Sequence, residues 1–327
     1  MKLDMKLDSP KANLLKAIYH QAPSHVPFAG EGAYRLVDHV GRKPPRAGRD
    51  EWGVVWAPLP ASYEPGPAEP AESYAVEHPA RSVAEALALP LPLGCDAACF
   101  AGLFDRQDAA QTLLIGQHGS GLLDRFILLL GMQKALVALV AEPEAAAAVL
   151  ERIADYHAAV ARGYLAAGSE AAWLADDYAG SDGPYLRPAL WRRLILPQMA
   201  RVIAVYREAG VPVFFHTCGR AEAFVGDLLD AGVTVFNLQS EACDLTALRQ
   251  RYGRRIAFVG GIPSGLMLTG GPENIRQAAQ AAIATLGQGG GLILAPDQPL
   301  AFPRENEAAL AAAAREYGRY PPGLCEA

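Results

Sequence analysis

Short apolar runs alternate with longer segments of helical periodicity from Ser82 to the C-terminus. The short runs predict strands at 112–115, 171–175, 211–215, 233–238, 256–259 and 291–294. The longer segments predict helices at 122–140, 143–167, 188–209, 221–230, 245–252, 272–286 and 305–317. Such alternation is typical of parallel strands joined by crossover helices.

The N-terminal part has a different pattern. A helix is predicted from Ser9 to Gln21, because Ser9 can cap it and Pro10 suits its first turn. Residues 25–30 follow as a short buried strand. Residues 41–80 are rich in proline and glycine and predict an irregular region with one hairpin.

With the N-terminal strand, the chain offers about seven strand candidates, one fewer than a closed barrel needs. We therefore expect an α/β fold, a (β/α)8 TIM barrel, in a single domain over residues 1–327. Residues 1–80 would form an N-terminal extension packed on the barrel. A doubly wound sheet is the competing architecture, but the first strand is not followed by a GxGxxG turn.

Composition excludes several classes of protein. The chain is 51% hydrophobic and 20% charged, with a net charge of −6. Without a basic stripe, nucleic acid is not an expected partner. The five cysteines are odd in number and lack framework spacing, which favours reduced thiols in a cytoplasmic protein. No signal peptide and no apolar run of membrane-spanning length is evident.

Catalytic groups of a parallel barrel lie where strands end, so the polar residues at these ends are the candidates for chemistry. They are Glu31, His118, Asp176, Asp177, His216, Cys218, Gln239, Glu241 and Asp297.

His216-Thr217-Cys218 is the most specific of these patterns. Imidazole and thiolate are preferred zinc ligands, and residues two apart at a strand end point the same way. A zinc site needs a third protein ligand, for which Glu241, Cys243 and Asp297 are candidates. Asp176 and Asp177 are also close in a barrel mouth, and the sequence does not choose among the five. A packed cysteine beside a hydrogen-bonded histidine is the structural alternative.

Asp176 and Asp177 are adjacent acids at one strand end, so both cannot face the core. One would cap the following segment, and the other would bind substrate or act as an acid or base. His118 precedes Gly-Ser-Gly, which can bind an anion through backbone N–H groups or form a plain turn.

The sequence resembles the uroporphyrinogen decarboxylase-like superfamily, in its cobamide-dependent methyltransferase branch. The resemblance rests on the strand ending in His216-Thr-Cys-Gly and spans most of the chain. Supporting stretches are Asp50-Glu-Trp-Gly, Leu130-Gly-Met-Gln, Ala175-Asp-Asp-Tyr, Phe258-Val-Gly-Gly-Ile, Gly289-Gly-Gly-Leu-Ile-Leu and Pro303-Arg-Glu-Asn.

This resemblance implies a (β/α)8 barrel in which zinc, held by the His-x-Cys pair and a later cysteine, activates a thiol. The thiol accepts a methyl group from a methylated corrinoid carried by a partner protein. Two departures stand out. The stretch from Ala295 to Pro299 has no cysteine and offers Asp297 or Gln298 instead, and Pro263 stands where an aspartate is common.

We therefore expect a zinc-dependent methyltransferase that uses a corrinoid protein and a small thiol. Asp176 and Asp177 would be catalytic, and Glu31, His118, Gln239 and Gln298 would contact the substrate. A tetrapyrrole decarboxylase is the first alternative, although the N-terminal stretch offers only Arg35 of the arginines which that branch uses. A non-catalytic barrel that binds a corrinoid or tetrapyrrole is the second.

Overall fold

The computed structural model describes residues 9–39, 47–58, 73–90, 92, 96–104 and 109–320. The predicted irregular region 41–80 thus lies partly outside the described residues, as do Cys95 and Cys325. The chain packs as two compact units. The central unit comprises residues 36–104 and 115–233, and the terminal unit comprises 1–35, 105–114 and 234–327.

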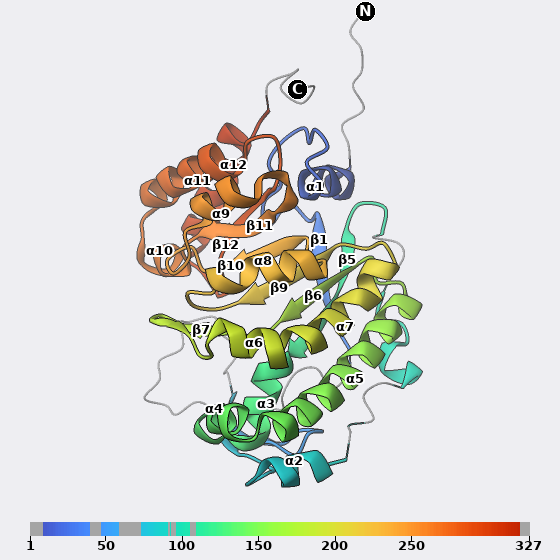
Figure 1. The fold of residues 1–327 in the computed structure, drawn as a ribbon. Helices are drawn as coiled ribbons and strands as arrows, with labels where there is room; N and C mark the ends of the chain where they lie inside the picture. The colour runs from blue at the N-terminus through green and yellow to red at the C-terminus, as the bar shows by residue number, and fades with distance from the viewer. Residues whose placement is uncertain are drawn as a thin grey trace, which may run out of the picture. The chain divides into compact units, whose positions relative to one another are not determined.

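The central unit contains three neighbouring parallel strands, β5 (Leu113–Ser120, from Ile115 onward), β6 (Ala171–Ala175) and β9 (Val213–Thr217). Their register pairs Ile115 with Ala171 and Ala175 with His216. Apolar residues form the first part of β5 and β9 and all of β6, and three consecutive residues of β9 are fully buried. The crossover helices are α5 (Pro143–Ala167), α6 (Pro188–Leu194), α7 (Leu196–Glu208) and α8 (Glu222–Ala231) (Figure 1).

The terminal unit repeats the pattern with parallel strands β10 (Val235–Leu238), β11 (Ala257–Ile262) and β12 (Leu292–Pro296). Its helices are α1 (Pro10–Ile18), α9 (Leu245–Tyr252), α10 (Ser264–Thr269), α11 (Pro272–Leu286) and α12 (Arg304–Tyr317). Helices α11 and α12 pack side by side (Figure 1). The expected α/β class, with parallel strands and crossover helices, is therefore confirmed.

The segments before and after β5 in the sequence add further elements to the central unit. Strands β2 (Gly48–Arg49), β3 (Val55–Pro58) and β4 (Ser73–Glu77) form an antiparallel sheet. Asp50 organises its first turn, because its carboxylate accepts the backbone N–H groups of Trp52 and Val54 and the indole N–H of Trp56, each at 2.9 Å. These segments also contain helices α2 (Val83–Ala88), α3 (Leu122–Leu130) and α4 (Met132–Ala141) and a 3-10 turn, η1 (Ala97–Phe100).

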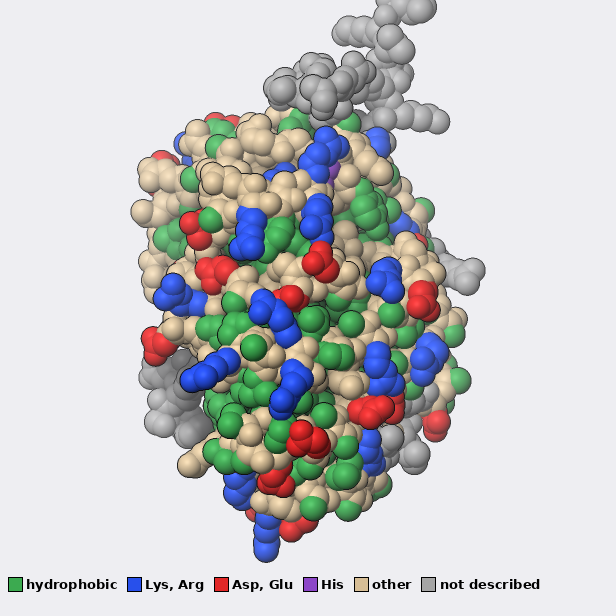
Figure 2. Space-filling model, in the orientation of Figure 1, with side chains coloured by type: hydrophobic (Ala, Val, Ile, Leu, Met, Phe, Trp, Pro, Cys, Tyr) green, Lys and Arg blue, Asp and Glu red, His purple; other side chains and the backbone are tan. Residues whose placement is uncertain are grey.

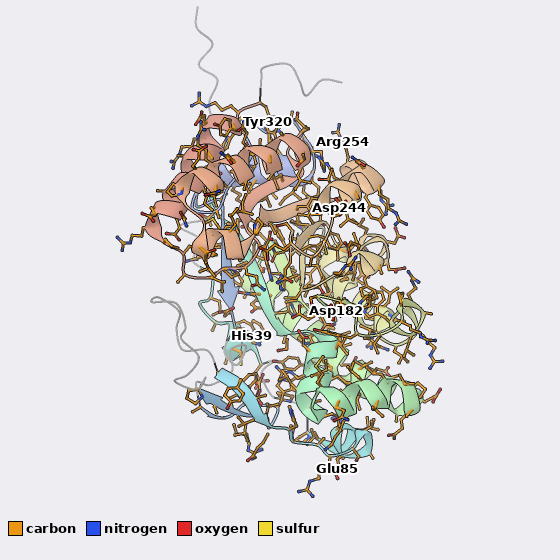
Figure 3. All side chains as sticks on the ribbon, turned by 90° about the vertical axis from the view of Figure 1, so that its left-hand side faces the viewer. His39, Glu85, Asp182, Asp244, Arg254 and Tyr320 are labelled. Atoms are coloured by element: carbon orange, nitrogen blue, oxygen red, sulfur yellow. The ribbon has the colours of Figure 1, made fainter. Side chains whose placement is uncertain are left out.

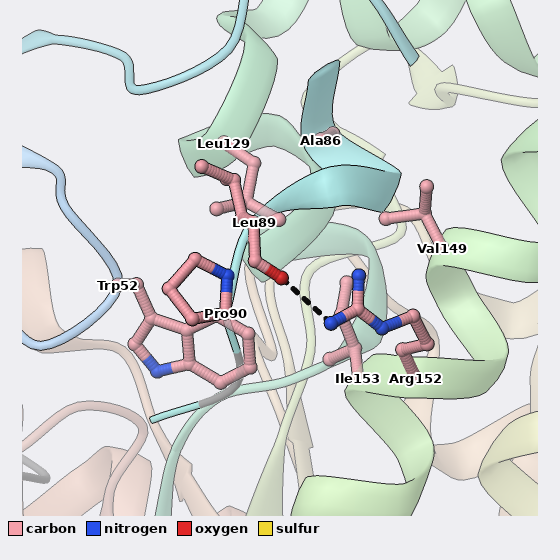
Figure 4. A pocket seen from close by; sticks show the side chains of 8 residues that line it. All are labelled: Trp52, Ala86, Leu89, Pro90, Leu129, Val149, Arg152 and Ile153. Atoms are coloured by element: carbon pink, nitrogen blue, oxygen red, sulfur yellow. Dashed lines mark hydrogen bonds between the residues drawn. The ribbon is translucent and has the colours of Figure 1, made fainter. Parts of the chain in front are cut away.

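Helix α2 is tied to α5 by one arginine. The Arg152 guanidinium donates hydrogen bonds to the backbone carbonyls of Leu87 and Leu89 at the end of α2. Figure 4 shows the bond to Leu89. The surrounding hollow is lined by apolar side chains, including Trp52 and Ile153. This arrangement satisfies carbonyl groups that a helix end leaves without partners.

Most predicted elements are confirmed, and the bounds of β6, α5, α9 and α11 are those expected. The strand predicted at 25–30 is wrong, since only isolated bridges form there and β1 (Tyr34–Asp38) follows. The helix predicted at 122–140 is two helices, broken at Gly131, whose φ of 82° does not continue a helix. Helix α10 and the hairpin of β7 (Ala179–Gly180) and β8 (Gly183–Pro184) were not predicted.

The surface mixes charges of both signs. Basic and acidic side chains are interspersed on the face drawn in Figure 2. Some form ion pairs, such as Arg192 with Asp227 at 2.9 Å and Arg276 with Glu316 at 2.8 Å. Among the described residues, no helix has both the length and the apolarity that a membrane crossing requires.

Candidate metal centre

The candidate site is built on the paired ends of β6 and β9 in the central unit. Ala175 is opposite His216 in the parallel register, and the Asp176 N–H donates to the His216 carbonyl at 3.1 Å. This pairing places the residues just beyond both strands at one edge of the sheet. Asp177 and Cys218 follow the strand ends there and lie close to His216.

Three potential ligands converge at this edge. His216 Nε2 lies 3.3 Å from Cys218 Sγ and 3.9 Å from Asp177 Oδ1, and the ligand atoms all lie within 4.8 Å of one another. A tetrahedral zinc ion with bonds of about 2.0–2.3 Å spaces its ligands roughly 3.3–3.8 Å apart. The side chains are half-buried, with exposed fractions of 18% for His216 and 36% for Asp177. The three groups are therefore close enough together to share one cation, and they are reachable from solvent.

Contacts of backbone groups hold the loop after β9 in place. The Asp177 carboxylate accepts the Cys218 N–H at 2.8 Å. Gly219 has a φ of 70°, and a Cβ there would overlap the carbonyl oxygens of Ala179 and Gly180 in the β7–β8 hairpin. Only glycine suits that position, so Gly219 allows the chain to turn closely after Cys218.

Asp176 is fully buried and caps helix α3. Its two carboxylate oxygens accept the N–H groups of Leu123 at 3.1 Å and Asp124 at 2.9 Å. Burial raises the pKa of Asp176 to about 7, while these two N–H donors act to lower it. Of the two adjacent acids, Asp176 is thus the one that caps the following helix, and Asp177 faces the candidate ligands.

Asp124 is a further site residue that the sequence did not indicate. Its carboxylate accepts the Asp177 N–H at 3.3 Å. Burial, and then the charges of Asp176 and Asp177, raise its pKa well above the ordinary value. Nothing in the sequence marks this residue, because it lies within a predicted helix 53 positions from Asp177.

Tyr185 is a second site residue that the sequence did not indicate. It follows the β7–β8 hairpin, whose tip carries Asp182 (Figure 3), and its N–H donates to the Tyr178 carbonyl at 2.9 Å. Burial raises the pKa of its phenol, and the negative charges of Asp177 and Cys218 raise it further. The phenol is therefore within electrostatic range of the candidate ligands.

The structure places His118 between the sheet and its covering helices. Its Nδ1 is 3.1 Å from His157 Nδ1 in α5, and its Nε2 is 2.6 Å from the Tyr206 hydroxyl in α7. The ring is 2% exposed. His157 is also buried, and its Nε2 has no hydrogen-bond partner among the described atoms. Burial lowers the pKa of His157 to about 3.

Replacing His157 with glutamine is expected to reduce the loss of stability in acid. The folded-state pKa lies below the unfolded value of about 6.5, so the unfolded state binds the extra proton between pH 6.5 and 3. From pH 6.5 to 5 the native protein should lose about 2 kcal/mol more unfolding free energy than His157→Gln. Urea titrations at both pH values measure this difference. His78→Gln, at an exposed histidine, is the control, and parallel pH profiles for native protein and His157→Gln would contradict the expectation.

The other expected site residues belong to the terminal unit. Asp297 ties strand ends together there, because its carboxylate accepts the Ser240 N–H at 2.8 Å, the Ser240 hydroxyl at 2.5 Å and the Gly261 N–H at 2.8 Å. Burial raises its pKa. Glu241 is exposed, and Cys243 is buried with 4% exposure.

Glu31, Gln239 and Gln298 also lie in the terminal unit. Glu31 Oε1 is 2.5 Å from His25 Nε2, and its other oxygen accepts the Phe28 N–H at 3.3 Å. Gln239 accepts backbone hydrogen bonds from the loop that follows it, and the Gln298 N–H donates to the Ser264 hydroxyl at 2.9 Å. Substrate contact by these three residues stays a prediction.

Known proteins share both the fold and part of the sequence. A methyltransferase structure from Methanosarcina mazei aligns with 95% of this chain and 99% of that chain, with a TM-score of 0.72 and 15% identity, which shows a common fold. The chain is 29% identical over 162 residues to the methylcobamide:CoM methyltransferase MtaA of Methanosarcina barkeri, covering 49% of this chain and 45% of that protein. It is 30% identical over 202 residues to a uroporphyrinogen decarboxylase of Nocardia farcinica, covering 60% of this chain and 55% of that protein.

The match to MtaA thus spans about half the length of each protein, and the relatives include enzymes of two kinds. The family model for uroporphyrinogen decarboxylase (URO-D) covers residues 105–317, which is well over half of the chain. The chain therefore belongs to the uroporphyrinogen decarboxylase family.

Proposed function

We propose that this protein is a zinc-dependent methyltransferase that moves a methyl group from a methylated corrinoid protein to a small thiol. The observation that carries the proposal is the meeting of an imidazole, a thiol and a carboxylate at the ends of β6 and β9. The relative from M. barkeri, named a methylcobamide:CoM methyltransferase, supports the reaction type and the corrinoid partner.

The residues present fit zinc in both charge and donor type. Neutral His216 with anionic Cys218 and Asp177 supplies a charge of −2, which balances a divalent cation. Nitrogen, sulfur and oxygen are all donors that zinc accepts, and three protein ligands leave a fourth position for substrate. Of the five candidates, Asp177 is therefore our proposed third ligand in preference to Glu241 and Asp297. It would compensate for the cysteine that is missing between Ala295 and Pro299.

The mechanism assigns distinct tasks to residues of the chain. Zinc, when bound, would lower the pKa of an acceptor thiol so that the sulfur attacks as a thiolate. His216 and Cys218 would hold zinc at the ends of β6 and β9, which leaves one position on the metal for the acceptor sulfur. Asp177 would fix the Cys218 loop through its hydrogen bond to the Cys218 N–H. Tyr185, whose phenol lies within electrostatic range of Asp177 and Cys218, would contact the acceptor.

A tetrapyrrole decarboxylase is the second candidate, favoured by the longer match to the N. farcinica enzyme. Decarboxylation needs no thiol acceptor and releases CO2. A non-catalytic barrel that binds a corrinoid or tetrapyrrole is the third candidate, and it predicts tight binding of a corrinoid without turnover.

Measurement of bound zinc, together with assays of methyl transfer and of CO2 release, separates these candidates. Protein purified without chelator is expected to contain about one zinc ion per chain and to methylate 2-mercaptoethanol with methylcobalamin as donor. Treatment with 1,10-phenanthroline should lower that rate by about 10²-fold or more, and added zinc should restore it. Negligible zinc together with CO2 release from uroporphyrinogen would favour the decarboxylase and overturn the proposal.

A further inference from the structure

Helix α3 lacks a cap of its own. Its N-cap residue is Gly121, which has no side chain. A Cβ at Gly121 would lie 2.5 Å from the Ala175 carbonyl oxygen and from Asp176 Cβ. Glycine is therefore needed to let the end of β6 approach the first turn of α3. Asp176 occupies this space and caps the helix from outside, through the N–H groups of Leu123 and Asp124.

The helix returns the hydrogen bond. Asp124 is the third residue of α3, the position from which an acidic side chain in a capping box reaches back to its own N-cap. Here its carboxylate instead accepts the N–H of Asp177, the residue after the cap. The start of α3 and the end of β6 thus exchange hydrogen bonds. The Asp176 carboxylate accepts the Asp124 N–H, and the Asp124 carboxylate accepts the Asp177 N–H. We refer to this pair of contacts as the reciprocal cap.

The reciprocal cap is directly linked to the candidate metal ligands. It fixes the Asp177 backbone, and the Asp177 carboxylate in turn accepts the Cys218 N–H at 2.8 Å. A continuous line of hydrogen bonds therefore runs from α3 through Asp177 to the loop that carries Cys218.

Electrostatics gives the cap a second effect. The carboxyl groups of Asp124, Asp176 and Asp177 repel one another when ionised. The partial positive charge at the N-terminus of α3 offsets this repulsion.

We infer that Asp124 is a positioning residue, which orients the Asp177 carboxylate for metal binding through the reciprocal cap. This inference rests on the proposed function, since it takes Asp177 as a metal ligand. Asp124 itself does not touch the metal. Outer contacts that orient a ligand typically change metal affinity by about 10–100-fold when removed.

The test compares two substitutions at Asp124 with a matched cap elsewhere. Asp124→Ala removes the acceptor for the Asp177 N–H, whereas Asp124→Asn keeps an acceptor oxygen. Asp244→Ala is the control, because Asp244 caps α9 by accepting the Ala247 N–H at 2.8 Å and belongs to the terminal unit (Figure 3). Zinc affinity is measured by competition with a chromogenic chelator, and backbone deuterium uptake is measured over residues 172–180 and 213–222.

Asp124→Ala is expected to weaken zinc binding by about 10–100-fold. It should also speed deuterium uptake in both segments, with or without metal. Asp124→Asn should stay within about threefold of the native zinc affinity, because it keeps the acceptor oxygen. Asp244→Ala should do the same, because the loss of a cap in the terminal unit does not act on the metal ligands. Unchanged affinity and uptake in folded Asp124→Ala would overturn the inference. If the native protein takes up no zinc, the proposed function fails, and the uptake comparison still decides whether Asp124 holds Asp177.

Discussion

Cys218→Ser is expected to lower zinc affinity by about 10²- to 10³-fold and to abolish methyl transfer. The thiolate supplies one of the two negative charges and the only soft donor of the proposed site, whereas a serine hydroxyl stays neutral at neutral pH. The side chains are nearly the same size, so the fold should be retained. Zinc content after dialysis and chelator competition measure the loss.

A second cysteine provides the control for this substitution. Cys99 is half-buried in the 3-10 turn of the same unit and belongs to no candidate metal group among the described residues. Cys99→Ser should therefore keep native zinc content and activity. Equal zinc in native protein and Cys218→Ser would place the metal elsewhere, and equal methyl transfer would remove the thiol from the mechanism.

Asp177→Ala is expected to weaken zinc binding by about 10²-fold, since it removes one of three protein ligands and the hydrogen bond that holds the Cys218 N–H. Asp177→Asn should fall between alanine and native protein. It keeps an oxygen acceptor for that N–H but loses the charge that balances the cation. The difference between the two variants separates loop positioning from ligation.

Two further acids allow the third ligand to be identified by the same measurement. Glu241→Gln removes a charge from an exposed side chain and should leave zinc affinity within about threefold of native. Asp297→Asn tests an acid whose oxygens already accept three hydrogen bonds from Ser240 and Gly261. A loss of zinc from Glu241→Gln or Asp297→Asn, with none from Asp177→Ala, would reject Asp177 as the ligand.

The errors in the predicted secondary structure have physical causes that lie outside the local sequence. Residues 122–140 have continuous helical periodicity, and the break at Gly131 is set by packing, because a Cβ there would contact the His78 ring at 3.0 Å. Residues 25–30 are apolar like a strand, yet only Phe28 and His25 form bridges. In both cases the local pattern is compatible with two structures, and contacts with distant residues decide between them.

The sequence by itself determined the α/β class, most strand and helix positions, and the pairing of His216 with Cys218, because these follow from periodicity and spacing along the chain. It also placed Asp176 and Asp177 at a strand end. Only the tertiary structure decided that Asp176 caps α3 while Asp177 faces the imidazole and thiol. The division of roles depends on the register between β6 and β9 and on the position of α3 beside the end of β6. Both bring together residues that lie about 40 to 50 positions apart in the sequence. Local sequence carries no information on such distances, so the division of roles between two neighbouring aspartates appears only when the chain is folded.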